Sequence, residues 1–425
     1  MTIDIDSIDK AFSPTHEIHE PKKFIGRYSE IENCIVGLST EGSFITIFGL
    51  RGIGKSSIAN QIKLIAEGNK TLPKMLHLDH LIPKKGFNYM VHLIRCDEFI
   101  VDIRCLVKRI LLGDDQNESI FSHNKNGDKR ITNYKEKSKA NAGVNVSILK
   151  AGVESEGEIY YETVRTDDLI QEFRQALLVT NKDNQDKTGL IILIDEFDII
   201  KNKSGFASLI KSCTSNFVKF GVVGIGESIE DLIEGHTSIG RQITSVIVSP
   251  MQEKELIQII KSAETTLKGE ICFTDEVIQE VVKEAEGFPY FVHLLGKECL
   301  LTAFKRNERI VNKNIYDEIK GNLINGKISL TQEFRYVETC RTSPERELLL
   351  KLFANVDSNY ILIEDVYKQA KDYGIDKPSK FLGVLIDTKN IAPVLIKSRD
   401  DRNVRFADPI FKVYSKKRRN IHNLY

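Results

Sequence analysis

Apolar residues gather in five short runs within the first 250 residues. The runs cover residues 44–48, 91–95, 190–194, 220–224 and 245–249. Residues 190–194 are the most apolar of these runs. Such a continuous run, unlike an alternating one, indicates a strand buried on both faces, as in the middle of a parallel sheet. Helical spacing lies between the runs, as in Ile58, Ile62 and Ile65. The pattern predicts an α/β fold with a right-handed parallel sheet.

The pattern becomes helical after Pro250. Apolar periodicity predicts helices over 252–267, 274–285, 289–305 and 312–324, which would form a compact helical module. From about residue 343 we expect three helices followed by two strands, 394–397 and 403–406. That order resembles a winged helix, used either to bind DNA or to pack against protein.

These patterns divide the chain into four predicted parts. Residues 1–23 are polar and predict an extended arm, and residues 24–250 form the α/β core. Within the core, residues 113–165 predict a loop rich in Asp, Asn, Lys and Ser, followed by a β-hairpin. A helical lid (251–330) and a winged helix (331–425) complete the chain.

The first apolar run leads into the segment Gly49-Leu50-Arg51-Gly52-Ile53-Gly54-Lys55-Ser56, which fits the P-loop pattern G-x-x-x-x-G-K-[ST]. Its glycines let the backbone curl so that N–H groups point at phosphate oxygens. Lys55 would reach the β- and γ-phosphates, and the Ser56 hydroxyl would coordinate Mg²⁺. A strand before the loop and a helix from Ser56 and Ser57 onward are the context that this motif requires.

Two acids follow the most apolar run. Asp195 would sit at the strand tip opposite Ser56 and bind the Mg²⁺ shell, and Glu196 would orient and polarise the attacking water. Asp198 is either a supporting group or a turn residue. A solvated acidic loop after a core strand is the simpler alternative, but the P-loop favours a catalytic one.

The next two strands carry weaker signals. Glu227 or Ser228 could sense the γ-phosphate, although a tight glycine turn explains that segment equally well. Arg241 precedes the last strand, where its planar cation either reaches the nucleotide of a neighbouring subunit or forms a salt bridge within the chain.

Taken together, the chain resembles the AAA+/STAND division of P-loop ATPases, near the replication-initiator-like ATPases of bacteria and archaea. The resemblance covers roughly residues 24–330. It rests on Phe24-Ile25-Gly26-Arg27, the P-loop, Asp195-Glu196, Arg241 and Gly287-x-Pro289 in that order.

The resemblance implies that ATP and Mg²⁺ are the cofactors, with Phe24, Ile25 and Pro289 near the nucleotide and with Arg241 in a homo-oligomer. Many relatives carry a sensor Arg near the Gly-x-Pro turn, where this chain has His293 and Lys297. That departure indicates a slow switch more than a fast motor.

Composition bears on the possible partners of the chain and on its location in the cell. The 60 basic and 60 acidic residues balance, but residues 331–425 hold 18 Lys and Arg against 13 Asp and Glu. DNA contact through residues 377–419 is therefore an alternative to a solubilising tail. Seven scattered cysteines, a polar N-terminus and the absence of a long apolar run predict a cytoplasmic protein without membrane contact.

Three functions remain open from the sequence. The first is an ATP-hydrolysing switch that controls assembly or the binding of a protein partner. The second is a DNA-binding, initiator-like or loader-like ATPase. The third is a sensor ATPase of phage defence.

Overall fold

The computed structural model describes residues 4–14, 16–115, 117–123, 146–148, 163–165, 169–226, 228–233, 239–387, 393–398 and 401–422. The chain forms two compact units. One unit contains Glu17–Gly49 and Gly54–Ser249, and the other contains Met1–His16, Leu50–Ile53 and Pro250–Tyr425. We call them the sheet unit and the lid unit. The finer boundaries predicted at residues 24, 250 and 330 stay predictions.

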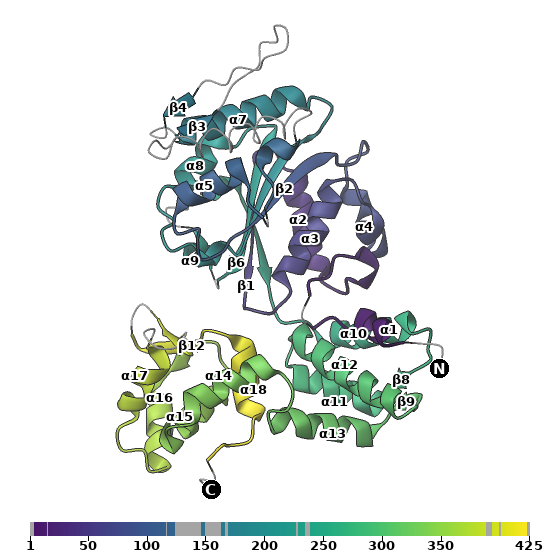
Figure 1. Ribbon diagram of the computed structural model, residues 1–425, viewed down its shortest axis with the longest axis vertical. Coiled ribbons are helices and arrows are strands. Elements are labelled where there is room, and N and C mark those ends of the chain that lie inside the picture. Colours follow the sequence, from purple (N-terminus) through teal and green to yellow (C-terminus); the bar gives the residue numbers. More distant parts are fainter. Residues whose placement is uncertain are drawn as a thin grey trace. The chain divides into compact units, whose positions relative to one another are not determined.

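The sheet unit is built on five parallel strands in the order β2-β5-β6-β1-β7 (Figure 1). Each predicted apolar run forms one of them, so the predicted α/β fold is confirmed. The strands are β1 (Phe44–Gly49), β2 (Tyr89–Arg95), β5 (Gly189–Asp195), β6 (Val218–Ile225) and β7 (Ile243–Val248). Every residue of β1 and β5 is buried, as expected for inner strands of a parallel sheet.

Helices cover both faces of this sheet (Figure 1). On one face lie α2 (Tyr28–Ser39) and α3 (Lys55–Ala66), and on the other lie α5 (Ile103–Leu112), α7 (Leu169–Asp183) and α8 (Phe206–Cys213). The short helices α4 (Thr71–Met75) and α9 (Ile229–Leu232) complete the unit. The carboxyl ends of the five strands, where the P-loop and the two acids lie, therefore form one edge between two helical layers.

The predicted β-hairpin is present in outline. Strands β3 (Val146–Ile148) and β4 (Thr163–Arg165) pair antiparallel, with Ser147 opposite Val164. The residues between them lie outside the described part of the chain, as do residues 124–145 of the predicted loop.

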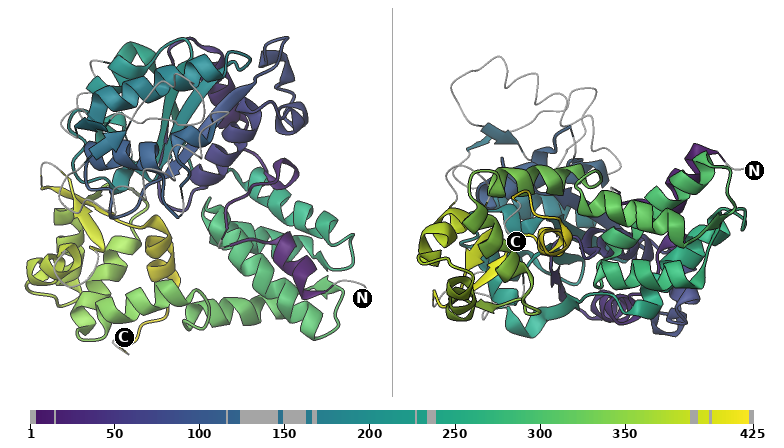
Figure 2. Two further views of the ribbon diagram at one scale, coloured as in Figure 1. Left: turned by 45° about the horizontal axis from the view of Figure 1, so that its top comes forward. Right: turned by 90° about the horizontal axis from the view of Figure 1, so that it is seen from below.

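The predicted lid helices form α10 (Glu253–Thr266), α11 (Asp275–Ala285), α12 (Pro289–Lys305) and α13 (Lys313–Ile324). Strands β8 (Cys272–Phe273) and β9 (Ile310–Val311) follow α10 and α12 in the chain and pair with each other in parallel. The N-terminal segment differs from the extended arm that its polarity predicts, because it forms helix α1 (Ile5–Ala11). This helix lies against α10 and α12 (Figure 2).

The C-terminal part of the lid unit contains helices, and a small antiparallel sheet in the order β10-β12-β11. This helix and strand order is the one expected of a winged helix. The elements are α14 (Leu330–Cys340), α15 (Pro344–Ala354), β10 (Ile361–Leu362), α16 (Ile363–Asp372), α17 (Pro378–Ile386), β11 (Leu395–Lys397), β12 (Asn403–Phe406) and α18 (Pro409–Lys417). In the part of the chain that the structure describes, no helix combines the length and apolarity of a membrane span.

The basic run at the end of α18 is engaged inside the lid unit. Lys417 contacts Glu284 at 2.9 Å and Glu286 at 3.1 Å. Arg418 bonds Glu333 through two nitrogens, at 2.7 and 2.8 Å, and both side chains are largely buried. A paired, bidentate geometry of this kind is stronger than a typical surface ion pair. These cations therefore hold α18 against α11 and α14.

A buried histidine predicts that the sheet unit is sensitive to acid. His92 of β2 is almost fully buried, and burial lowers its pKa to about 3, with a further contribution from His123. The unfolded chain takes up a proton near pH 6.5 and the folded chain does not, so stability falls as pH drops below 6.5. Between pH 6.5 and 5 the expected loss is about 2 kcal/mol, measurable as urea unfolding midpoints.

A matched pair of variants tests this cause. In His92→Leu the slope of stability between pH 6.5 and 5 is expected to flatten. In His80→Leu, which changes an exposed histidine, the slope is expected to stay as in the wild type. An unchanged slope in His92→Leu would assign the acid sensitivity to another group.

Candidate functional site

The P-loop has the backbone that its glycines predict. Gly52 and Gly54 have φ angles of 72° and 100°, in the left-handed region that side chains disfavour. Gly49 is needed for a different reason, because a Cβ there would lie 2.4 Å from the Val248 carbonyl oxygen. The loop thus curls between the end of β1 and the start of α3, where Gly54 is the N-cap.

The first turn of α3 holds the predicted phosphate-binding and metal-binding side chains. Lys55, Ser56 and Ser57 are its first three residues, and all three are half-buried. Unsatisfied N–H groups and the positive end of the helix dipole make this position favourable for an anion. In the loop itself Arg51 is exposed and Ile53 is buried.

The Ser56 side chain lies beside the Asp195 carboxylate. Asp195 ends β5 and is 3% exposed, and its carboxylate accepts the Glu196 N–H at 2.8 Å. Burial raises the pKa of Asp195, and Ser56 and the Glu196 N–H oppose the shift. A hydroxyl next to a carboxylate suits Mg²⁺, a hard cation that completes its shell with water and phosphate oxygens. The residues present therefore fit a magnesium ion held by Ser56 and Asp195.

Glu196 differs from its neighbour in both exposure and backbone. It is exposed, and its φ of 55° is unusual for a residue other than glycine. Partial burial and the adjacent Asp195 raise the pKa of its carboxyl. Backbone strain of this kind concentrates at functional sites. It turns Glu196 outward immediately after the buried Asp195.

Asp198 has a structural contact. Its Oδ1 accepts the Ile225 N–H at 2.7 Å, which joins the turn after β5 to the end of β6. Of the two roles that the sequence leaves open, this contact favours the turn residue.

The segment before α2 is fastened to the end of β7. Arg27 is buried, has a φ of 62°, and donates to Glu30 at 2.9 Å and to the Ser249 carbonyl at 2.5 Å. Phe24 is buried and Ile25 is half-buried. Arg27 therefore fixes the segment that carries these two predicted nucleotide contacts.

The remaining predicted residues are placed only in part. Glu227 lies outside the described residues, and Ser228 directly precedes α9. Arg241 is exposed, and no ion pair joins it to another residue that the structure describes.

The Gly-x-Pro turn lies in the lid unit, where it contacts Pro250 and Met251. Gly287 has a φ of 85°, and its carbonyl accepts the Met251 N–H at 2.9 Å. A Cβ on Gly287 would lie 2.6 Å from Pro250. Pro289 is the first residue of α12, the favoured position for proline in a helix.

His293 and Lys297, which the sequence resemblance placed at the position of a sensor Arg, both contact the N-terminal segment. The Ser13 N–H donates to Nδ1 of His293 at 3.3 Å, and Lys297 pairs with Asp9 at 2.5 Å. Burial lowers the pKa of His293 to about 4, so this ring is neutral near pH 7.

Sequence reasoning missed a polar cluster beside the predicted site. Glu17 pairs with Arg95 at 2.7 Å and accepts from Asn60 at 2.8 Å. Arg95 is the last residue of β2 and lies opposite Asp195 in the strand register. The available signal was the polar face of α3, where Ser57, Asn60 and Gln61 interrupt an otherwise apolar helix.

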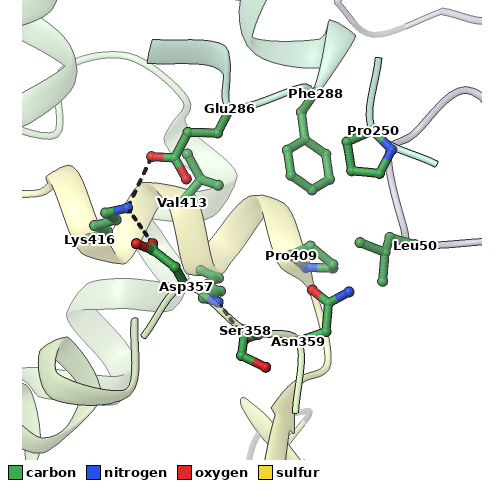
Figure 3. A pocket seen from close by; sticks show the side chains of 11 residues that line it. Leu50, Pro250, Glu286, Phe288, Asp357, Ser358, Asn359, Pro409, Val413 and Lys416 are labelled. Carbon is green, nitrogen blue, oxygen red and sulfur yellow. Dashed lines mark hydrogen bonds and ion pairs between the residues drawn. The ribbon is translucent and has the colours of Figure 1, made fainter. Parts of the chain in front are cut away.

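A cavity of about 300 Å³ lies within the lid unit, between the Gly-x-Pro turn and the C-terminal elements (Figure 3). Its cations already have partners. Lys416 contacts Glu286 at 3.5 Å and Asp357 at 3.3 Å, and Lys412 donates to the carbonyls of Val356 and Ser358. The cavity therefore lies where two parts of the unit pack together. Its lysines already have partners within the chain, so the cavity is not a candidate ligand site.

Comparisons with known proteins give structural likeness without a sequence match. No family model and no curated protein matches the chain. Among solved structures, the chain is similar to a Walker-type ATPase of Pyrococcus abyssi, with 14% identity, a TM-score of 0.48, and coverage of 95% of this chain and 99% of that chain.

Two further likenesses extend over similar lengths. The ORC2 protein of Aeropyrum pernix gives 12% identity, a TM-score of 0.48 and coverage of 96% of both chains. The RuvB Holliday junction branch migration motor of Thermotoga maritima gives 13% identity, a TM-score of 0.42, and coverage of 92% of this chain and 94% of that chain. The sheet order, and the P-loop between β1 and α3, establish the P-loop NTPase fold from this chain itself.

Proposed function

We propose that this chain is a Mg²⁺-dependent, ATP-hydrolysing molecular switch of the AAA+/STAND type. The observation that carries the proposal is the placement of the Ser56 side chain beside the Asp195 carboxylate. It unites the P-loop helix with the acidic end of β5, which is the juxtaposition that a phosphate-bound Mg²⁺ needs. A glycine-rich turn without ligand chemistry would not require a buried carboxylate beside its serine.

The chain's residues divide the work as follows. Lys55 and the P-loop N–H groups bind phosphate, with Gly49, Gly52 and Gly54 shaping the loop. Ser56 and Asp195 hold the metal, which when bound neutralises charge on the phosphates. Glu196 accepts a proton from the attacking water. Phe24 and Ile25 line the base.

Arg241 and the lid unit extend the proposal to a switch. Arg241 is exposed without an ion pair to any described residue, which supports a role at the nucleotide of a neighbouring subunit in a homo-oligomer. Because His293 and Lys297 contact the N-terminal segment, neither is free to act as a sensor cation on α12. That arrangement supports slow turnover, and we propose that the nucleotide state controls the binding of a protein partner. The seven free cysteines support a cytoplasmic setting.

Magnesium-dependent ATP binding tests the proposal directly. Wild-type protein is expected to bind ATP more tightly with Mg²⁺ than with EDTA, as measured by calorimetry. Ser56→Ala is expected to weaken Mg²⁺–ATP binding by about tenfold and to leave metal-free binding unchanged, because only the metal-bound oxygen is lost. Ser212→Ala, an exposed serine of α8, is the matched control. A wild-type chain that fails to bind ATP at millimolar concentration overturns the proposal.

The DNA-binding alternative now depends on fewer residues. Lys417 and Arg418 are held in ion pairs within the lid unit, so phosphate contacts would use other cations of residues 377–419, such as the exposed Lys377 and Lys380. A duplex-binding constant that does not change between about 50 and 200 mM salt would exclude such contacts.

A further inference from the structure

The N-terminal segment has contacts in both compact units. Residues up to His16 belong to the lid unit, and residues from Glu17 onward belong to the sheet unit. Phe12 and Glu17 are five residues apart in the chain, so their Cα atoms cannot separate by more than about 18 Å. We call residues 4–19 the N-terminal strap and consider its two ends separately.

The first end is anchored in the lid. Ile8 and Phe12 are fully buried, and the Phe12 ring lies edge-on to Phe273 and to His293, with ring centroids 6.1 and 5.8 Å apart. A Cβ on Gly296 of α12 would lie 2.4 Å from the Phe12 ring. The lid helix therefore has a glycine at the point where the strap seats its aromatic side chain.

The second end is anchored on the P-loop helix. The Ile18 N–H donates to the Ser57 hydroxyl at 3.0 Å, and the side-chain amide of Gln61 donates to the carbonyls of Ile18 and His19 at 2.9 and 3.2 Å. Gln61 is fully buried. Since residues three and four apart share a helix face, Ser57, Asn60 and Gln61 form one polar face of α3 that contacts the strap.

This second anchor lies beside the proposed chemistry. Ser57 follows Ser56 directly, and Glu17 holds Arg95 through both carboxylate oxygens, at 2.7 and 2.8 Å. Arg95 pairs in register with Asp195 across neighbouring strands. A pull on the strap therefore reaches both the P-loop helix and the acidic edge of the sheet.

We propose that the N-terminal strap couples the lid unit to the nucleotide site, so that a displacement of α12 is transmitted through Phe12 and Glu17 to α3 and Arg95. The inference rests on the proposed nucleotide switch for its purpose. The mechanical coupling itself is testable without nucleotide. A short chain segment that is anchored at both ends limits how far its anchors can move apart, whereas a segment that is anchored at one end does not.

Hydrogen exchange at single amides measures the coupling in the nucleotide-free protein. Gly296→Ala pushes Phe12 from its seat while favouring the helix that carries it. We expect the Ile18 amide, which belongs to the other anchor, to exchange about tenfold faster in this variant. Gly321→Ala makes the same chemical change on α13 with open space around it, and is expected to leave Ile18 unchanged.

Phe12→Ala supplies a second lid-anchor variant, and Glu17→Gln tests the reverse direction. Removing the Glu17 charge is expected to accelerate exchange of the Ser13 amide, which is bonded to His293 in the lid. Exchange at Ile18 that matches the wild type in both lid-anchor variants overturns the inference, because the two anchors would then act independently.

A strap of altered length separates this inference from the proposed function. Six Gly and Ser residues inserted between Ser13 and Pro14 leave both anchors chemically intact. We expect ATP affinity within about twofold of wild type and kcat reduced about fivefold. The same insertion at Gly269, in the turn after α10, is the control. Unchanged kcat in the strap variant counts against coupling, whereas failure of wild-type protein to bind ATP counts against the switch and leaves the exchange result to judge the strap.

Discussion

Glu196→Gln is expected to lower kcat for ATP hydrolysis by roughly 10²–10³-fold while changing ATP affinity by less than about twofold. Glutamine keeps the size of the side chain and its outward position but cannot accept the proton of the attacking water. Asp195, which is buried and lies beside Ser56, is untouched, so metal and phosphate binding should persist. Phosphate release and calorimetric titration with Mg²⁺–ATP measure the two effects separately.

The outcome discriminates among the acids of this edge. If turnover survives in Glu196→Gln, the water is activated elsewhere, and Asp198 becomes the next residue to replace.

Mixing Glu196→Gln subunits with Arg241→Ala subunits adds a test of the oligomer. Activity should reappear in the mixture only if Arg241 acts on a neighbour, because one interface then combines an intact glutamate with an intact arginine.

Gly49→Ala is expected to destabilise the sheet unit by about 3 kcal/mol or more and to weaken ATP binding with it. The added methyl group would meet the Val248 carbonyl at 2.4 Å, and Gly49 pairs with Val248 in the register of two parallel strands. Because the obstacle is backbone, no side-chain rotation relieves it. The strands must separate, and the P-loop that begins at this residue moves with them.

Urea unfolding followed by tyrosine fluorescence gives the stability of the variant. Gly240→Ala is the matched control, since it lies just before β7 and has open space where the Cβ would stand. Its stability should stay within about 0.5 kcal/mol of wild type. Equal stability of the two variants would mean that β7 shifts freely, and that Gly49 is required only for its part in the loop.

The sheet and the P-loop were predictable because burial on both faces leaves a strong trace in sequence. The run 190–194 contains only Leu and Ile, and it forms the buried strand next to the sheet edge. The loop was predictable for a similar reason, since positive φ at Gly52 and Gly54 is a backbone requirement that few residues meet.

The N-terminal helix and its contacts were not predicted, because their signals are short. Ile5, Ile8 and Phe12 have helical spacing, but seven helical residues provide too little periodicity to outweigh a polar composition. The local sequence around Asn60 and Gln61 of α3 does not indicate which groups these side chains contact. Their role appears only when a segment distant in sequence supplies the carbonyls and the carboxylate that they bond.

Charge was the least predictable part. The cations of residues 416–419 suggested a tail open to phosphate, whereas Lys417 and Arg418 are held by acids far away in the sequence. Lys219 of β6 is a further example. It is buried and donates to the carbonyls of Leu38 and Thr40 at the end of α2. Ion pairs and helix caps made across long sequence distances leave no local pattern.

The ion pairs of α18 make the C-terminal elements a lever. Lys417 forms ion pairs with Glu284 and Glu286, which lie just before the Gly287 turn of the lid. Arg418 forms an ion pair with Glu333 on α14. If the lid helices rotate, the C-terminal elements rotate with them through the same angle. The displacement at its tip grows with its distance from the pivot. A movement of a few tenths of an ångström at the turn would thus become a larger one at the far end of the C-terminal elements.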